Sequence, residues 1–129
     1  MENLRFRAWD KEDNKMVRWE NLRLVKNNRD KDLRVVDITY SPIKFKKAKL
    51  MQSTGLKDIN GIEIYEGDIV HVNYKLSIVK YAKGSFYIEF IDFPKIIMLS
   101  DFYFKSYTND LILKVQGNIY ENPELLEDE

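Results

Sequence analysis

Turn-forming sequences interrupt this chain about every eight to twelve residues, and no segment carries a long helical repeat of apolar residues. Between the turns lie short segments of alternating, β-branched or aromatic residues, such as residues 4–8, 69–72 and 85–91. Asn60-Gly61 is typical of a hairpin turn, because both residues tolerate positive φ. Roughly seven to nine short strands follow from this spacing. The sequence therefore predicts a mainly β domain, α+β if its minor helices are counted, built as a small β-barrel or as two packed sheets of short antiparallel strands.

Three segments carry more specific expectations. Residues 36–40 alternate between apolar and polar side chains, which predicts a strand with Val36, Ile38 and Tyr40 on one face. Residues 96–107 fit either a short helix or another strand. Asn122-Pro123 predicts the cap and first position of a terminal helical turn.

Composition indicates one folded domain and excludes several chemistries. The chain has 129 residues, of which 44% are hydrophobic and none is cysteine. This length fits a single domain over residues 1–129, with a subdivision near residues 50–55 into a basic β part and a barrel-like part as the alternative. Disulfides, a thiol nucleophile and cysteine-ligated zinc are ruled out.

No apolar run reaches the roughly 20 residues that span a bilayer, and the charged first residues do not resemble a secretion signal. We therefore expect a cytoplasmic protein with no membrane partner.

Charge is balanced over the whole chain but unevenly distributed. Residues 1–50 hold 14 basic and 8 acidic side chains, a net charge of +6, whereas residues 51–129 hold 7 and 13, a net charge of −6. Such charge asymmetry is typical of a protein that binds an anionic partner, or of one whose two parts attract each other, within one chain or between chains. The zero net charge favours the second interpretation. If the basic part does contact nucleic acid or another partner, with Phe45 stacking on a base, the candidate residues are Arg23, Lys26, Arg29, Lys44, Phe45, Lys46, Lys47 and Lys49.

A second group of residues fits tight turns. Glycine supplies positive φ or a close approach of two backbone segments, while Asn and Asp side chains bond their own turn. The residues interpreted in this way are Gly55, Asn60, Gly61, Gly67, Asp68 and Gly117. The alternative is a carboxylate cluster for a metal or for acid–base chemistry, formed by Asp58, Glu63, Glu66 and Asp68, but the spacing does not match a calcium loop. We expect turn chemistry, with no metal and no catalytic group.

Other catalytic signatures are missing from the sequence. His71 is the only histidine, and no partner that would make it a general base is indicated. Ser53 and Thr54 lack the strand–turn–helix setting of a nucleophile elbow, and no glycine-rich phosphate loop is present. We therefore expect a protein that is not an enzyme and that uses no cofactor.

Aromatic residues make up 13% of the chain. Trp9, Trp19 and the run Phe102-Tyr103-Phe104 are expected in the core or at its rim, where large rings of small domains usually lie. The alternatives are exposed stacking platforms for the two Trp rings and an apolar patch that seeks a partner for the Phe102 run. So many rings, added to the aliphatic strands, exceed what one small domain buries. We therefore expect a homo-oligomer that covers part of this surface.

Four segments of the chain are distinctive motifs: residues 6–10 (FRAWD), 50–58 (LMQSTGLKD), 61–69 (GIEIYEGDI) and 117–126 (GNIYENPELL). Together they resemble the YopX-like family of small proteins from phages and prophages of Gram-positive bacteria. They fall in order at the start, middle and end of the chain, whereas residues 17–49 and 71–115 carry no recognisable motif of this kind. The resemblance implies a β-rich, phage-derived protein in the cytoplasm of a bacterial host, and it implies no reaction.

Function is therefore predicted only as a class. We expect a phage or prophage accessory protein of unknown activity, a non-enzymatic binding or assembly module whose partner is a second copy or an unidentified phage or host protein. The alternative is a nucleic-acid-binding accessory protein that uses residues 23–49. The near-neutral isoelectric point, about 6.6, does not favour that alternative.

Overall fold

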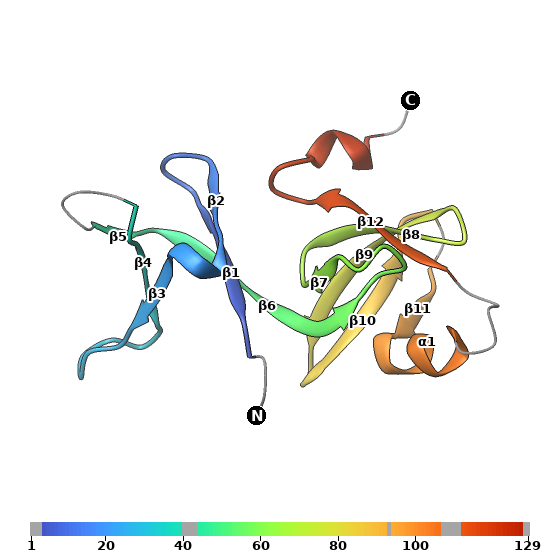
Figure 1. The fold of residues 1–129 in the computed structure, drawn as a ribbon, viewed down its shortest axis with the longest axis horizontal. Helices are drawn as coiled ribbons and strands as arrows, with labels where there is room; N and C mark the ends of the chain where they lie inside the picture. The colour runs from blue at the N-terminus through green and yellow to red at the C-terminus, as the bar shows by residue number, and fades with distance from the viewer. Residues whose placement is uncertain (1–3, 40–43, 93, 107–111, 128–129) are drawn as a thin grey trace. The chain divides into compact units, whose positions relative to one another are not determined.

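The computed structural model describes residues 4–39, 44–92, 94–106 and 112–127. This part of the chain is mainly β, as predicted, with twelve strands, one α-helix and two 3₁₀ turns. Several strands have only three residues, so their number exceeds the roughly seven to nine that the turn spacing predicts. Packing divides the chain into two compact units, Met1–Gln52 and Ser53–Glu129, and strand β6 (Ala48–Lys57) begins in the first unit and ends in the second (Figure 1).

The first unit contains two small antiparallel sheets. Strand β1 pairs with both β2 and the first half of β6, and β4 lies between β3 and β5. Its elements are β1 (Phe6–Asp10), β2 (Lys15–Val17), the 3₁₀ turn η1 (Trp19–Asn21), β3 (Leu22–Val25), β4 (Arg34–Asp37) and β5 (Lys44–Lys46). The core between the sheets is formed by Ala8, Val17, Leu22 and Val35. Strands β1 and β2 form the first hairpin of the chain, in which Ala8 is the register partner of Val17.

Strand β4 differs from the prediction. The alternation predicted a strand with Val36 and Ile38 on one face, but β4 ends at Asp37 and Ile38 is 37% exposed. Val35 and Val36 are both buried, so both faces of the strand are covered. A strand covered on both faces shows no apolar–polar alternation, which is why the pattern placed it wrongly. Tyr40 lies outside the described residues.

The second unit is built on one five-stranded antiparallel sheet that curls like half a barrel (Figure 1). Its strand order is β11-β10-β9-β8-β12, and β7 pairs with the second half of β6. The elements are β7 (Glu63–Tyr65), β8 (Asp68–Val72), β9 (Lys75–Ala82), β10 (Ser85–Phe90), β11 (Ile96–Met98), α1 (Leu99–Ser106), β12 (Leu113–Asn118) and the 3₁₀ turn η2 (Pro123–Leu126). Its core includes Ile64, Val70, Val79, Ile88 and Leu113.

Residues 96–106 form both of the structures that the sequence left open. Strand β11 pairs with β10, and α1 begins directly after it at Leu99. The helix lies beside β10 and β11 (Figure 1), where Leu99 and Phe102 are each 2% exposed. None of the helices formed by the described residues has the length and hydrophobicity needed to cross a bilayer.

The terminal turn forms as predicted, but its cap does not. Pro123 is the first residue of η2, and Asn122 precedes it. The Asn122 side chain makes no cap hydrogen bond to the turn; instead, Asn122 Oδ1 accepts from the backbone N–H of Asn118 at 3.2 Å. The side chain therefore fastens the end of β12 to the turn that follows.

Candidate functional site

Gly61 closes the hairpin between β6 and β7. The carbonyl of Asp58 accepts from Gly61 N–H at 3.0 Å, and Asp58 N–H donates to the carbonyl of Ile62 at 2.8 Å. Gly61 has a φ of +81°, whereas Asn60 is not among the described residues with positive φ. The predicted hairpin is confirmed, but its left-handed conformation belongs to Gly61 alone.

The other predicted turn residues are also placed at irregular points of the backbone. Gly55 lies where the register between β6 and β7 shifts, and Gly67 lies between β7 and β8; their φ values are +77° and +87°. Gly117 permits a close approach instead. A Cβ atom at Gly117 would lie 2.4 Å from Asn122 Oδ1, so a larger residue would displace the side chain that holds the end of β12.

Asp58 is a structural carboxylate. Its Oδ1 accepts from the N–H groups of Asn60 and Ile62 at 2.9 and 2.8 Å, and its Oδ2 accepts from Val115 N–H at 2.9 Å. The turn after β6 is thereby fixed to strand β12. Burial of Tyr103 and, as the smaller cause, the negative charge of Asp58 raise the pKa of Tyr103 to about 12.

Asp68 has a similar role in the next turn. It is 1% exposed, and its Oδ2 accepts from Tyr65 N–H at 2.8 Å. Across the described residues, no group of three or more acidic or histidine side chains is placed to hold a metal ion. Asp58 and Asp68 thus accept backbone hydrogen bonds within their turns, which is the turn chemistry interpreted from the sequence.

The predicted basic contacts all lie in the first unit or on β6. Of those whose side chains are described, all are exposed: Arg23 in β3, Lys26 and Arg29 in the loop after it, and Lys47 and Lys49 where β6 begins. Lys44, Phe45 and Lys46 form β5. Because β3 and β5 both pair with β4, the two basic segments meet in one small sheet.

The register of this sheet relates the two basic segments. Arg23 is paired with Val36, which is paired with Phe45, whereas Lys44 and Lys46 are paired with Asp37 and Val35. Arg23 therefore lies level with Phe45 across β4.

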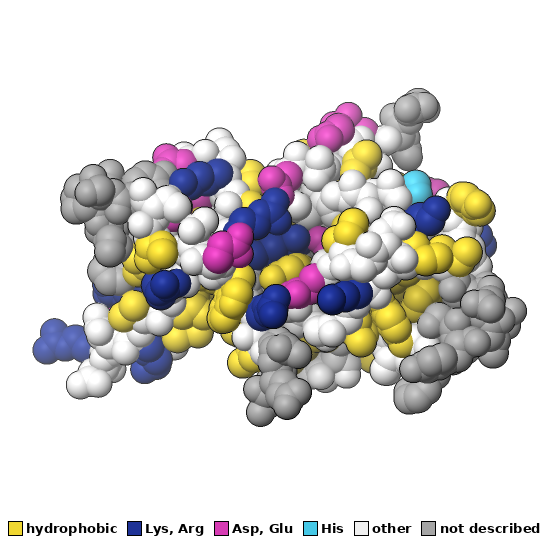
Figure 2. All heavy atoms as spheres, in the orientation of Figure 1, with side chains coloured by type: hydrophobic (Ala, Val, Ile, Leu, Met, Phe, Trp, Pro, Cys, Tyr) yellow, Lys and Arg dark blue, Asp and Glu magenta, His cyan; other side chains and the backbone are white. Residues whose placement is uncertain are grey.

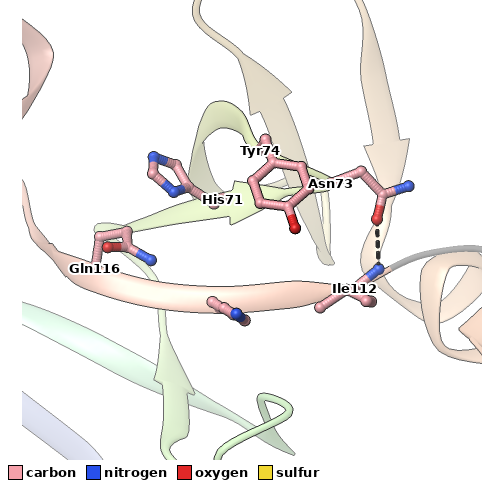
Figure 3. A pocket seen from close by; sticks show the side chains of 6 residues that line it. His71, Asn73, Tyr74, Ile112 and Gln116 are labelled. Carbon is pink, nitrogen blue, oxygen red and sulfur yellow. Dashed lines mark hydrogen bonds between the residues drawn. The ribbon is translucent and has the colours of Figure 1, made fainter.

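A hollow of about 160 Å³ opens beside β8 and β12 in the second unit. It is lined by His71, Asn73, Tyr74, Ile112, Lys114 and Gln116 (Figure 3). The register places His71 directly opposite Lys114 on these neighbouring strands. Figure 2 shows His71, in cyan, at the molecular surface.

Asn73 fixes one end of this hollow. Its N–H donates to the carbonyl of Ile112 at 3.0 Å, and its Oδ1 accepts from Ile112 N–H at 2.8 Å (Figure 3). The two bonds fasten the β8–β9 turn to the residue that precedes β12. The hollow is therefore framed by a braced turn and two paired strands, which are rigid supports for a binding surface.

Tyr74 is the most unusual residue of the hollow. It is 91% exposed and has a φ of +72°, next to Asn73 at +48°. A bulky side chain rarely adopts this conformation. In Figure 3 the Tyr74 ring lies between His71 and Asn73 and points its hydroxyl toward β12. Of this group only His71 stands out in the sequence, although Asn73 between two strand segments is a signal for a two-residue hairpin.

The aromatic residues are distributed between core and surface. Trp9 is half-buried, while Trp19 packs on Phe6 with ring centroids 6.4 Å apart and is still 39% exposed. Phe102 lies in the core and Tyr103 beside it, with centroids 5.5 Å apart. The expected position in the core or at its rim is confirmed for Trp9, Phe102 and Tyr103, whereas Trp19 is an exposed residue. The side chain of Phe104 lies outside the described residues.

Two comparisons find similar proteins over nearly the whole chain. The family model described as YopX protein matches residues 5–127. The crystal structure of protein EF1440 from Enterococcus faecalis is 27% identical, with a TM-score of 0.67, and the alignment covers 96% of this chain and 98% of that one. None of the curated proteins matches. The similarity therefore spans both compact units.

Proposed function

The chain belongs to the YopX family, and on that premise we propose that it is a phage or prophage accessory protein that acts as a non-enzymatic binding module in the bacterial cytoplasm. Its binding surface in this proposal is the hollow beside Tyr74. The hollow presents side chains of varied chemistry from β8, β12 and the turn between β8 and β9.

The observation that carries the proposal is the exposed ring of Tyr74 at positive φ. Strained backbone conformations cost roughly 1–3 kcal/mol and concentrate at functional sites. An aromatic ring that is 91% exposed gains little from core packing. A role in recognition accounts for an aromatic residue at this position better than folding does.

The hydrogen bonds of the buried carboxylates support a binding role over a catalytic one. Asp10, Asp37, Asp58 and Asp68 are each at most 8% exposed, and each accepts from backbone N–H groups of its own turn. Carboxylates held in this way stabilise the fold. Their roles leave the exposed hollow as the best-supported place for function.

A capture experiment tests the proposal. The immobilised chain would be exposed to lysate of prophage-carrying bacteria, with and without nuclease, and compared with Tyr74→Gly and Lys83→Gln. Lys83 lies in the β9–β10 turn at the far end of β9 and serves as the control. We expect a partner that Lys83→Gln retains and Tyr74→Gly loses. Equal capture by both variants would contradict the proposed surface, and loss after nuclease treatment would identify the partner as nucleic acid.

A further inference from the structure

We propose that the hollow binds a phosphate joined to a planar heterocyclic ring, the chemistry of a nucleotide unit. This inference rests on the proposed function, because it names the ligand of the same surface. The ring would stack on Tyr74, and the phosphate would be held by Lys114 and His71.

Two hairpins of the same sheet differ in the residue at the second position of the turn, which is Tyr74 in one of them. The β8–β9 and β9–β10 hairpins both have two-residue turns in which both residues have positive φ: Asn73 and Tyr74 in one, Lys83 and Gly84 in the other. Such turns favour glycine at the second position. The chain uses glycine in one hairpin and an exposed tyrosine in the other, so the turn geometry itself does not require the ring.

An exposed aromatic ring is a stacking platform. Every nucleobase has a π face, and stacking on a protein aromatic ring contributes to binding whatever the base. Two hydrogen bonds between Asn73 and Ile112 brace the turn that carries Tyr74. A turn held in this way loses little backbone freedom when a ligand stacks on the exposed ring that it carries.

The remaining lining groups suit an anion. None of the described residues that line the hollow is acidic, and Lys114 makes no ion pair with any residue of the described ranges. His71 lies opposite Lys114 and supplies a second nitrogen donor. Gln116 adds an amide for the edge of a base or a sugar hydroxyl.

Size and charge limit the ligand to about one nucleotide. The hollow measures about 160 Å³, below the roughly 300–1,000 Å³ of sites that enclose a whole drug-sized molecule. Residues 53–129 carry 7 basic and 13 acidic side chains, and this excess of acid disfavours a long polyanion lying across the unit. A free mononucleotide and the terminal nucleotide of a strand share the required chemistry.

Titration followed by amide NMR tests this inference. The probes are adenosine monophosphate, adenosine, inorganic phosphate and a short 5′-phosphorylated single-stranded oligonucleotide. We expect saturable chemical-shift changes at residues 71–75 and 112–116 with adenosine monophosphate, and weaker binding of adenosine or phosphate alone.

Tyr74→Gly and Lys114→Gln are each expected to weaken the binding of adenosine monophosphate about tenfold, as the loss of one stacking or charged contact would, while Lys83→Gln leaves it unchanged. Tighter binding of the oligonucleotide would identify a strand end as the source, and weaker binding a free nucleotide.

Two outcomes would overturn the inference. One is the absence of shifts at these residues with adenosine monophosphate at millimolar concentration. The other is binding that Tyr74→Gly and Tyr74→Asn leave unchanged; asparagine tolerates positive φ, so the second variant guards against misfolding. If nucleotides fail while Tyr74→Gly still abolishes capture from lysate, the ligand class is wrong and the proposed function stands. If capture is also insensitive to Tyr74, both fail.

Discussion

At the scale of single residues, Gly61 shows how one backbone conformation can determine a hairpin. Its φ of +81° is unfavourable for any residue with a branched Cβ. We expect Gly61→Val to lower the free energy of unfolding by about 1–3 kcal/mol, because the turn also sets the register of β6 and β7. Thermal and denaturant melts measure the loss.

Asn60→Ala is the matched control for this prediction. Asn60 lacks positive φ, and its part in the turn is a backbone N–H bond to Asp58 that alanine retains. The change should stay within about 0.5 kcal/mol. If Gly61→Val left the melting midpoint unchanged, the turn would not be needed for the fold.

At the scale of elements, Asp37 connects strands β4 and β2 of the first unit. It is 2% exposed, its Oδ1 accepts from the N–H and hydroxyl of Thr39 at 3.0 and 2.6 Å, and its Oδ2 lies 3.0 Å from Lys15 Nζ. Burial acts to raise the pKa of Asp37, but the hydrogen bonds from Thr39 and the charge of Lys15 outweigh it and hold the pKa below its ordinary value. The carboxylate therefore stabilises the folded state at neutral pH.

The sign of the pH effect follows from this lowered pKa. A carboxyl group with a lower pKa when folded contributes stability above its unfolded pKa of about 4, and that contribution disappears as the pH falls through the folded value. We expect Asp37→Asn to cost about 1–2 kcal/mol near pH 7 and distinctly less near pH 2. Urea denaturation at the two pH values measures the difference. An equal cost at both would show that the charge of Asp37 does not matter.

The elements that the sequence predicted well are those fixed by local chemistry. The β6–β7 hairpin could be predicted from Gly61, because turn residues act on their own backbone. The bounds of strand β4 could not be predicted, since Val35 and Val36 are both buried and the strand therefore lacks an apolar–polar alternation. Asp58 was recognised as a turn residue, but its bond to Val115, 57 residues away, depends on tertiary structure.

At the scale of the whole molecule, the acidic residues should give no metal dependence. Backbone N–H groups already occupy Asp58 and Asp68, and a specific ion would stabilise the folded state by mass action. We expect the melting temperature to stay unchanged when millimolar calcium, magnesium or zinc is added. A rise of several degrees that Asp68→Asn abolishes would contradict the structural role of that residue.

We also expect the purified protein to be a homo-oligomer, most simply a symmetric dimer. Large apolar side chains such as Ile59 and Ile96 are 59% and 58% exposed, and assembly is an economical way to cover them. Size-exclusion chromatography with light scattering gives the mass, and a monomer at tens of micromolar would refute the expectation. If the acidic residues 121–129 contribute, salt will weaken assembly, because exposed charges are screened over about 8 Å at physiological ionic strength.

The candidate site was the least predictable feature of the molecule. His71 and Lys114 are distant in the sequence and meet only because β8 pairs with β12. Tyr74 has no sequence motif; its significance comes from its φ and its exposure together. A strained conformation at a functional site contradicts local preference, which is why sequence patterns do not reveal it.

The free energy of unfolding of Tyr74→Gly tests most directly whether Tyr74 is present for binding and not for folding. Glycine relieves the strain at φ +72° but is more flexible in the unfolded chain, and the two effects nearly offset each other. We expect the free energy of unfolding of Tyr74→Gly to be unchanged, or higher by up to about 1 kcal/mol. A loss of more than about 1 kcal/mol would show that the ring supports the fold, and it would contradict the assignment of this hollow as the binding surface.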